Sequence, residues 1–227
     1  MKYLIKESNN TSLTLCGGKI TATCRRAAKR QRVPLGRRAR LLCFAALLFL
    51  VPQLISAQRT DAQRTDAQIS QETATLLRNA KIQVVNQRTD PHAFSLPMLT
   101  GGIAALSDFK GRIVILNFWA TWCPPCRAEM PSMENLYQRF RDQGLEILAV
   151  DIGEDENTIR RFINNNKYTF PVLLDTNKRI SNSYGIEAIP TTYILDREGK
   201  IIARVVGSIS WDSAQAIAAF DALLNNR

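Results

Sequence analysis

Short, almost continuously apolar segments alternate with amphipathic ones through the second half of the chain. Three segments rich in β-branched residues have the length and composition of buried strands: 111–120, 145–152 and 170–175. Helices are expected between and after them, over 130–140, 155–165 and 178–185. Gly144 and Gly185 stand where the first and the last of these helices are expected to end.

The two ends of this region have patterns of their own. Residues 190–207 are two β-rich runs joined by a turn that contains glycine, which predicts an antiparallel hairpin. A last helix is marked by three apolar residues at helical spacing, Ile217, Phe220 and Leu224. Ser210 is its expected N-cap. The stretches 76–85 and 92–99 fit either an edge hairpin or a short helix followed by a strand. The order β-α-β-α-β-α-β-β-α predicts an α/β domain, with a mixed central sheet and helices on both faces.

The N-terminal segment differs from the rest in charge. Residues 1–55 carry 11 basic residues and one acidic residue, whereas residues 56–227 carry 19 of each. A nucleic-acid-binding domain needs its basic residues on the folded unit, so the pattern disfavours that class. The uncharged run at 41–57 follows a basic run, which is typical of a signal peptide, although its length also allows an uncleaved membrane anchor. Both interpretations place the following chain in the periplasm or on the outer face of the cytoplasmic membrane.

A polar linker is expected between this leader and the folded domain. Residues 57–68 read AQRTDAQRTDAQ, a five-residue polar unit given twice and begun a third time. The repeat has no apolar periodicity with which to pack against a core. We therefore expect a leader over 1–57, a linker over 58–75 and one domain over 76–227.

The folded domain is expected to keep two of the five cysteines. Cys123 and Cys126 lie in the sequence WCPPC, whereas three others precede the export boundary: Cys16, Cys24 and Cys43. A zinc site with four thiolates needs a second pair, and His92 is the one histidine of the chain, so no structural metal is expected. A structural disulfide across so short a loop stabilises little. Redox chemistry remains, and it needs no cofactor beyond a Cys123–Cys126 disulfide.

The spacing of the motif gives its residues different roles. Pro124 and Pro125 suit the first turn of a helix, where a missing N–H costs nothing, so Cys123 is expected at the helix N-terminus. There the free N–H groups and the helix dipole favour the thiolate, which is the attacking species in thiol–disulfide exchange. We expect Cys123 to attack and the more buried Cys126 to resolve the mixed disulfide. Trp122 either shields one side of this site or packs in the core.

These residues resemble a known family. The sequence FWATWCPPCRAEMP, followed by IPTTYILDREGK, is similar to the thioredoxin superfamily over about residues 85–227. It is most similar to the exported, membrane-tethered TlpA/ResA-type branch, which is linked to cytochrome c maturation. The resemblance implies a thioredoxin-like fold with an N-terminal extension, a helical insertion at 153–169 and a helix kinked at Pro131. It also implies a cis-proline loop at 189–191 that pairs with the substrate backbone. The expected substrate-binding residues are Trp122, Pro124, Pro125, Ile189, Pro190 and Thr191.

Acidic residues near the motif are candidates for proton transfer. Thioredoxin has a buried aspartate six residues before its first cysteine, and Asn117, which cannot titrate, stands at that position. Glu129, three residues after Cys126, resembles the glutamate that this branch carries near its cysteines. A buried carboxylate there would accept the Cys126 proton and raise the thiol pKa, whereas a solvated one would have no role. Glu187, just before the proline loop, is a weaker candidate.

The function expected from this resemblance is that of a thiol-disulfide oxidoreductase acting on exported proteins that contain a disulfide. A reductase supplied with electrons by a membrane protein is favoured, with cytochrome c maturation as the process it would serve. The first alternative is an extracytoplasmic dithiol oxidant. A peroxiredoxin-type peroxidase is disfavoured because it needs a threonine about three residues before its cysteine, where this chain has Ala120. No nucleic-acid partner is expected, and contact with the membrane would be made through the N-terminal segment.

Overall fold

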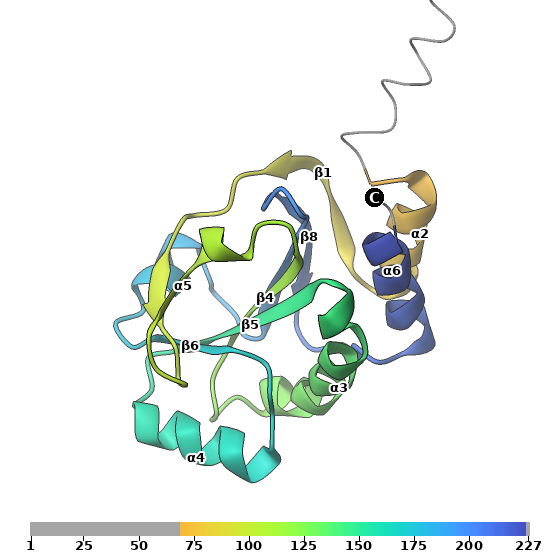
Figure 1. The fold of residues 1–227 in the computed structure, drawn as a ribbon. Helices are drawn as coiled ribbons and strands as arrows, with labels where there is room; N and C mark the ends of the chain where they lie inside the picture. Colours follow the sequence, from red (N-terminus) through yellow and green to blue (C-terminus); the bar gives the residue numbers. More distant parts are fainter. Residues whose placement is uncertain (1–68, 226–227) are drawn as a thin grey trace, which may run out of the picture. The chain divides into compact units, whose positions relative to one another are not determined.

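The computed structural model describes residues 69–225, so the expected leader and most of the expected linker lie outside the described residues (Figure 1). The strands of the described part are β1 (Gln83–Thr89), β2 (Ser95–Pro97), β3 (Ile103–Ala105), β4 (Ile113–Trp119), β5 (Leu145–Ile152), β6 (Val172–Asp175), β7 (Thr191–Leu195) and β8 (Ile201–Val206). The helices are α2 (Gln71–Asn79), α3 (Pro124–Phe140), α4 (Glu156–Asn166), α5 (Arg179–Ser183) and α6 (Ala214–Asn225), with short 3₁₀ turns η1 (Leu106–Phe109) and η2 (Arg141–Gln143). No helix within 69–225 is long and apolar enough to cross a membrane.

Six strands form one mixed sheet in the order β1-β8-β7-β4-β5-β6. β4, β5 and β6 run parallel to one another, and β7, β8 and β1 add to them in antiparallel fashion. β2 and β3 pair separately as a small antiparallel hairpin. The buried strands, the alternating helices and the C-terminal hairpin predicted from the sequence are confirmed.

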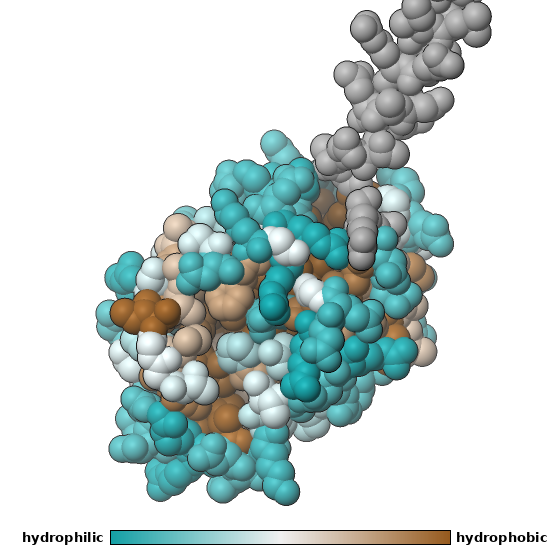
Figure 2. Space-filling view, in the orientation of Figure 1, coloured by the Kyte–Doolittle hydropathy of each residue, from teal (hydrophilic) through white to brown (hydrophobic). Residues whose placement is uncertain are grey.

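The side chains of β4 alternate between two layers of core. Ile113 and Ile115 face the layer that holds the buried residues of α2, α3, α4 and α6. Leu116 and Phe118 face the layer built from the β2–β3 hairpin, η1 and α5. Figure 1 shows α2 and α6 packed side by side, with α5 and the hairpin away from them. Helices therefore cover both faces of the sheet, as predicted for this α/β class. In the same orientation, hydrophilic side chains cover most of the visible surface, and apolar side chains show as separate spots (Figure 2).

The folded part begins earlier than the sequence prediction places it. α2 begins at Gln71, inside the segment 58–75 that was predicted to be linker. The Ser70 hydroxyl accepts the N–H of Thr73 and caps the helix, and Thr73 and Ala74 are buried. A cap and a buried helix face outweigh the polar composition of this stretch. The region 76–85 is accordingly the end of a helix followed by a strand, one of the two alternatives.

The cap of α6 also differs from the prediction. The hydroxyl of Ser213 accepts the N–H of Ala216 at 3.2 Å, so Ser213 and not Ser210 caps the helix. Ser210 instead contacts Asp212 through its hydroxyl, at 2.9 Å. The apolar spacing identifies the helix but does not distinguish between two serines three residues apart.

Candidate active site

The two cysteines lie where β4 ends and α3 begins. They form a disulfide, and Cys123 is the N-cap residue of α3, with its Sγ accepting the N–H of Cys126 at 3.2 Å. Pro124 and Pro125 occupy the first turn of the helix and are exposed. Cys126 is fully buried, and Cys123 retains 3% of its surface. After reduction, Cys123 is therefore the sulfur that lies at the positive end of the helix, where the thiolate is favoured.

A tight turn joins β4 to α3 and presents an aromatic side chain. The N–H of Cys123 donates to the carbonyl of Ala120 at 3.2 Å, so Thr121 and Trp122 are the central residues of this turn. Trp122 is 65% exposed. The prediction that Trp122 packs in the core is therefore wrong, and the ring lies on the surface, at the position next to the reactive cysteine.

The loop before β7 reaches the disulfide from a distant part of the chain. The Ile189–Pro190 peptide bond is cis, as the resemblance implies. The carbonyl oxygen of Ile189 lies 3.6 Å from Cys123 Sγ. Thr191 closes the loop with a hydroxyl that donates to the Ala188 carbonyl at 2.7 Å. The structure thus brings this predicted loop and Cys123 together, because β7 is paired directly with β4.

Glu129 is buried behind the disulfide, one turn after Cys126 in α3. Only 2% of it is exposed, which excludes the solvated interpretation. Its carboxylate accepts hydrogen bonds from Asn117 Nδ2 at 3.0 Å, Trp211 Nε1 at 3.1 Å and the Ile209 N–H at 3.4 Å. Burial raises the pKa of Glu129 to about 7, against the opposing effect of these three donors. The group therefore changes protonation state near neutral pH.

Comparison with known proteins shows the family to which the chain belongs. The model of the AhpC/TSA family matches residues 89–204. The chain belongs to this family. It is 39% identical over 126 residues to the thiol-disulfide oxidoreductase ResA of Bacillus subtilis strain 168, covering 56% of this chain and 70% of the relative. It is 40% identical over 117 residues to ResA of Geobacillus thermodenitrificans, covering 52% and 67%. The match thus spans about two thirds of the relatives' length.

Solved structures with this fold are redox proteins as well. A protein of Chlorobium tepidum assigned as thiol:disulfide interchange protein DsbE has a TM-score of 0.57 and 29% identity, and the match covers 62% of this chain and 99% of that one. The thioredoxin domain of a thiol-disulfide oxidoreductase from Bacteroides vulgatus has a TM-score of 0.55 and 27% identity, with the same coverage. The chain is therefore a TlpA/ResA-type thiol-disulfide oxidoreductase with a thioredoxin-like fold.

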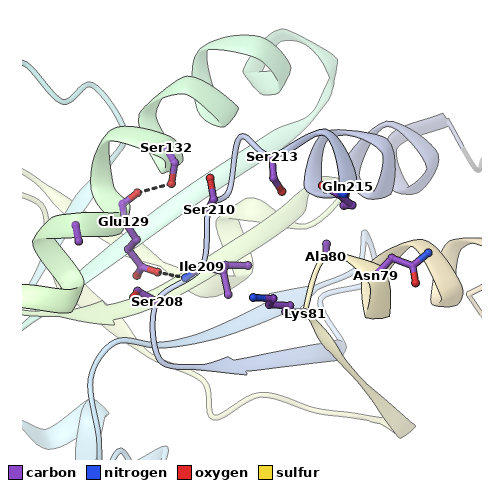
Figure 3. A pocket seen from close by; sticks show the side chains of 11 residues that line it. Asn79, Ala80, Lys81, Glu129, Ser132, Ser208, Ile209, Ser210, Ser213 and Gln215 are labelled. Carbon is purple, nitrogen blue, oxygen red and sulfur yellow. Dashed lines mark hydrogen bonds between the residues drawn. The ribbon is translucent and has the colours of Figure 1, made fainter.

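In this oxidoreductase, Glu129 also lines a pocket of about 590 Å³ between α3, the end of α2 and the segment before α6 (Figure 3). Most of the lining is polar: Asn79, Lys81, Ser132, Ser208, Ser210, Ser213 and Gln215. Ser132 fixes one wall, because its hydroxyl donates to the Glu129 carbonyl at 2.7 Å and accepts the Trp211 N–H at 3.1 Å. The buried Glu129 carboxyl group therefore belongs to a residue that lines a largely polar pocket.

Some residues of the site have no local pattern in the sequence that indicates their role. Ile209 and Trp211 lie about 80 positions from Glu129, and no local pattern indicates that they contact it. Asp151 and Glu154 have a sequence signal, namely carboxylates at and just after the end of a buried parallel strand that ends beside the end of β4. Glu187, the weaker candidate, is exposed.

Proposed function

We propose that this protein is a disulfide reductase of exported proteins that works by exchange through Cys123 and Cys126. The observation that carries the proposal is the position of Cys123, at the N-terminus of α3 and 3.6 Å from the carbonyl of the cis-proline loop. A backbone loop beside a reactive sulfur can pair with an extended substrate segment. Trp122, Pro124 and Pro125 lie next to Cys123 in the sequence and supply exposed apolar and ring surface.

The reaction is a two-electron exchange in two steps. The Cys123 thiolate attacks one sulfur of the substrate disulfide, that S–S bond breaks, and the other substrate sulfur leaves as a thiolate that takes up a proton. Cys126 then loses its proton and attacks Cys123 Sγ, which releases the second substrate sulfur and leaves the Cys123–Cys126 disulfide. The substrate gains two electrons and two protons, and the protein dithiol is oxidised.

In this scheme Glu129 accepts the proton of Cys126. The two residues are three apart in α3 and so lie on the same helix face, with Cβ atoms about 5–6 Å apart. A pKa of about 7 lets the carboxylate take a proton near neutral pH and release it again through the pocket. A carboxylate there also disfavours the thiolate, which stabilises the disulfide relative to the dithiol and makes the pair more reducing.

The cellular setting of the proposal comes from the N-terminal sequence and from the relatives. Residues 25–57 combine a basic run with an apolar run, which supports export or anchoring to the outer face of the cytoplasmic membrane. That compartment is oxidising, so a membrane protein with its own dithiol must return the disulfide to the reduced state. Exported proteins with a CxxC disulfide, apocytochrome c among them, are the proposed substrates. No cofactor beyond the Cys123–Cys126 disulfide is proposed.

The direction of electron flow is tested by the reduction potential of the full chain in glutathione and thiol redox buffers. A reductase is expected to lie nearer to the about −270 mV of thioredoxin than to the about −120 mV of the strongest oxidant with this fold. A value at the oxidising end would support the dithiol oxidant instead. Rapid consumption of hydrogen peroxide by the reduced protein would support the peroxidase.

The roles of the two sulfurs are tested by trapping. Cys126→Ser leaves Cys123 free to attack but removes the resolving sulfur, so mixed disulfides with substrates should accumulate in cells that export the full chain. Cys123→Ser is the matched control and should trap none. Mixed disulfides captured through Cys126 would reverse the proposed roles, and mass spectrometry of the captured partners would identify the substrates.

A further inference from the structure

A carboxylate outside the cysteine motif holds the turn that precedes it. Glu154 lies just after β5, in the segment between β5 and α4. One of its oxygens accepts the backbone N–H of Thr121 at 2.5 Å, and the other accepts the Thr121 hydroxyl at 2.6 Å. Thr121 is thus fixed at two points by a charged group, and hydrogen bonds to charged groups are stronger than those between neutral groups.

The turn held in this way is the one that positions the reactive sulfur. Thr121 and Trp122 are its central residues, and its closing hydrogen bond is donated by the N–H of Cys123. The turn also projects the exposed ring of Trp122. A change at Thr121 therefore reaches both the sulfur and the aromatic surface beside it, although Glu154 lies 33 positions from Thr121 in the sequence.

A second carboxyl lies beneath Glu154. Asp151 is 1% exposed, and its Oδ1 accepts the Glu154 N–H at 3.2 Å. Its Oδ2 is buried and has no hydrogen-bond partner within residues 69–225. A buried carboxylate without full hydrogen bonding is costly, so the neutral form is favoured. Burial, followed by the proximity of Glu154, raises the pKa of Asp151 to about 8.

Within residues 69–225, none of the main groups that shift the pKa of Asp151 is positively charged. Glu154 and Asp155, in the segment after β5, are the charged groups that act on it, and both are acidic. At the same level of the sheet, its neighbours are Trp119 in β4 and Leu174 in β6, which are uncharged. The stem of Lys178 packs over Gly153, one residue before Glu154.

We propose that Glu154 is a positioning residue for disulfide exchange, because it fixes the Thr121–Trp122 turn. We further propose that the proton on Asp151 allows the Glu154 carboxylate to stay in contact with Thr121. When Asp151 ionises, two negative charges lie side by side, and the turn loosens. The proposal rests on Cys123 as the attacking sulfur for its effect on the reaction, but the contact itself is independent of that role.

The contact is tested in the oxidised full-length protein, where neither active-site cysteine titrates. The Thr121 amide is followed by NMR from pH 6 to 9.5, as chemical shift and as hydrogen exchange. We expect a shift with a midpoint near 8 in the wild type and none in Asp151→Asn, which keeps the shape and one acceptor but cannot ionise. Glu154→Gln should raise the exchange rate of this amide at pH 6 by about tenfold, the factor for loss of about 1.4 kcal/mol. An unchanged Thr121 amide in Glu154→Gln, or the same midpoint in Asp151→Asn, would overturn the proposal.

The positioning role is tested by kinetics with two substrates, a small aromatic disulfide and a disulfide-bonded peptide. Thr121→Val removes the hydroxyl bond and keeps the side-chain shape, whereas Thr121→Ser keeps the bond. For the peptide, kcat/KM should fall several-fold in Thr121→Val and about tenfold in Glu154→Gln. In Thr121→Ser, kcat/KM should stay close to the wild-type value. The small disulfide should be affected less, because it does not need the Trp122 surface. Equal losses for both substrates would contradict the role. If the Thr121 amide behaved as expected but the wild type had no disulfide-exchange activity, the proposed function would be rejected. The contact between Glu154 and Thr121 would still be supported.

Discussion

Two buried carboxyl groups, Glu129 in α3 and Asp151 in β5, are held in different ways. Glu129 in α3 is 2% exposed and accepts three hydrogen bonds, from a side-chain amide, an indole and a backbone N–H. Asp151 at the end of β5 is 1% exposed, accepts one backbone N–H and lies beside another carboxylate. Burial raises the pKa of both, but the donors around Glu129 limit the rise to about 7, whereas the acidic neighbours of Asp151 extend it to about 8.

The difference separates two uses of a buried acid. A carboxyl that titrates near neutral pH and opens on a polar pocket can pass a proton in each catalytic cycle. A carboxyl that stays protonated through neutral pH is suited to hold structure, and Asp151 contacts the segment that fixes the turn before Cys123. Similar burial therefore does not imply a similar role, because the neighbours decide which charge state is present.

Of the substitutions that test the different roles of Glu129 and Asp151, the largest effect is expected on the second step of disulfide exchange. Glu129→Gln keeps the size of the side chain and removes the proton acceptor, so release of a mixed disulfide by Cys126 should slow by about 100-fold, the lower range for loss of a general base. Stopped-flow kinetics with a preformed mixed disulfide at pH 7 measures this step. Asp151→Asn is the matched control and should remain within about twofold at the same pH, since Asp151 is already neutral there. Equal slowing in both variants would show that the two acids do not have separate roles.

The next effect concerns the stability of the oxidised protein as pH rises. The folded protein keeps the proton of Asp151 up to a pH of about 8, whereas the unfolded chain releases it above its ordinary value of 3.8. The free energy of unfolding should therefore decrease between about pH 5 and 8, by at most about 1.4 kcal/mol per pH unit for this group. Asp151→Asn should lack this contribution. Urea unfolding at pH 5, 6, 7 and 8 measures the two slopes, and parallel slopes would contradict the raised pKa.

Local spacing in the sequence predicts a role for the first of these acids, whereas the second has only the weaker signal of its place at the end of a buried strand. Glu129 follows the cysteines by one helical turn, so its place on the motif helix is fixed by local spacing. Its burial depends on Trp211 and Ile209, which arrive from the C-terminal part of the chain. Local periodicity contains no information about such contacts, and the contact between Glu154 and Thr121 is of the same kind.

The fold itself was more accessible to prediction. β4 and β5 are buried on both faces, so their residues form continuous apolar runs that are visible in the sequence. The errors fall at helix starts, where one side chain decides the boundary: Ser70 caps α2 inside the expected linker, and Ser213 caps α6 in place of Ser210. The β2–β3 hairpin was not predicted, because each of its strands has only three residues and β3 lies outside the stretches 76–85 and 92–99.

A smaller effect is expected from removing one of the hydrogen-bond donors to the Glu129 carboxylate. Trp211→Phe removes the indole N–H that lowers the pKa of Glu129 and leaves most of the buried ring volume. The pKa of Glu129 should rise further above 7, and the free energy of unfolding should fall by about 1–3 kcal/mol from the lost charge-assisted bond and the smaller ring. NMR titration of the Glu129 carboxyl in the oxidised protein measures the first quantity. A fall in this pKa would mean that the hydrogen bond does not stabilise the carboxylate.

The smallest effect is expected from substitution of Glu187. This substitution tests whether an exposed carboxylate near the proline loop takes part in proton transfer. Glu187 lies three residues before Pro190, close in sequence to the loop beside Cys123, but its side chain is exposed. A solvated carboxylate stabilises little and is screened by salt, so Glu187→Gln should change the exchange rate by less than about twofold and stability by less than about 0.5 kcal/mol. The measurement is the pH dependence of exchange at low and at physiological ionic strength. If Glu187→Gln removed the titration near pH 7 and Glu129→Gln left it in place, the proton would be passing through the proline loop and not through α3, and the comparison between the two buried acids would no longer describe the reaction.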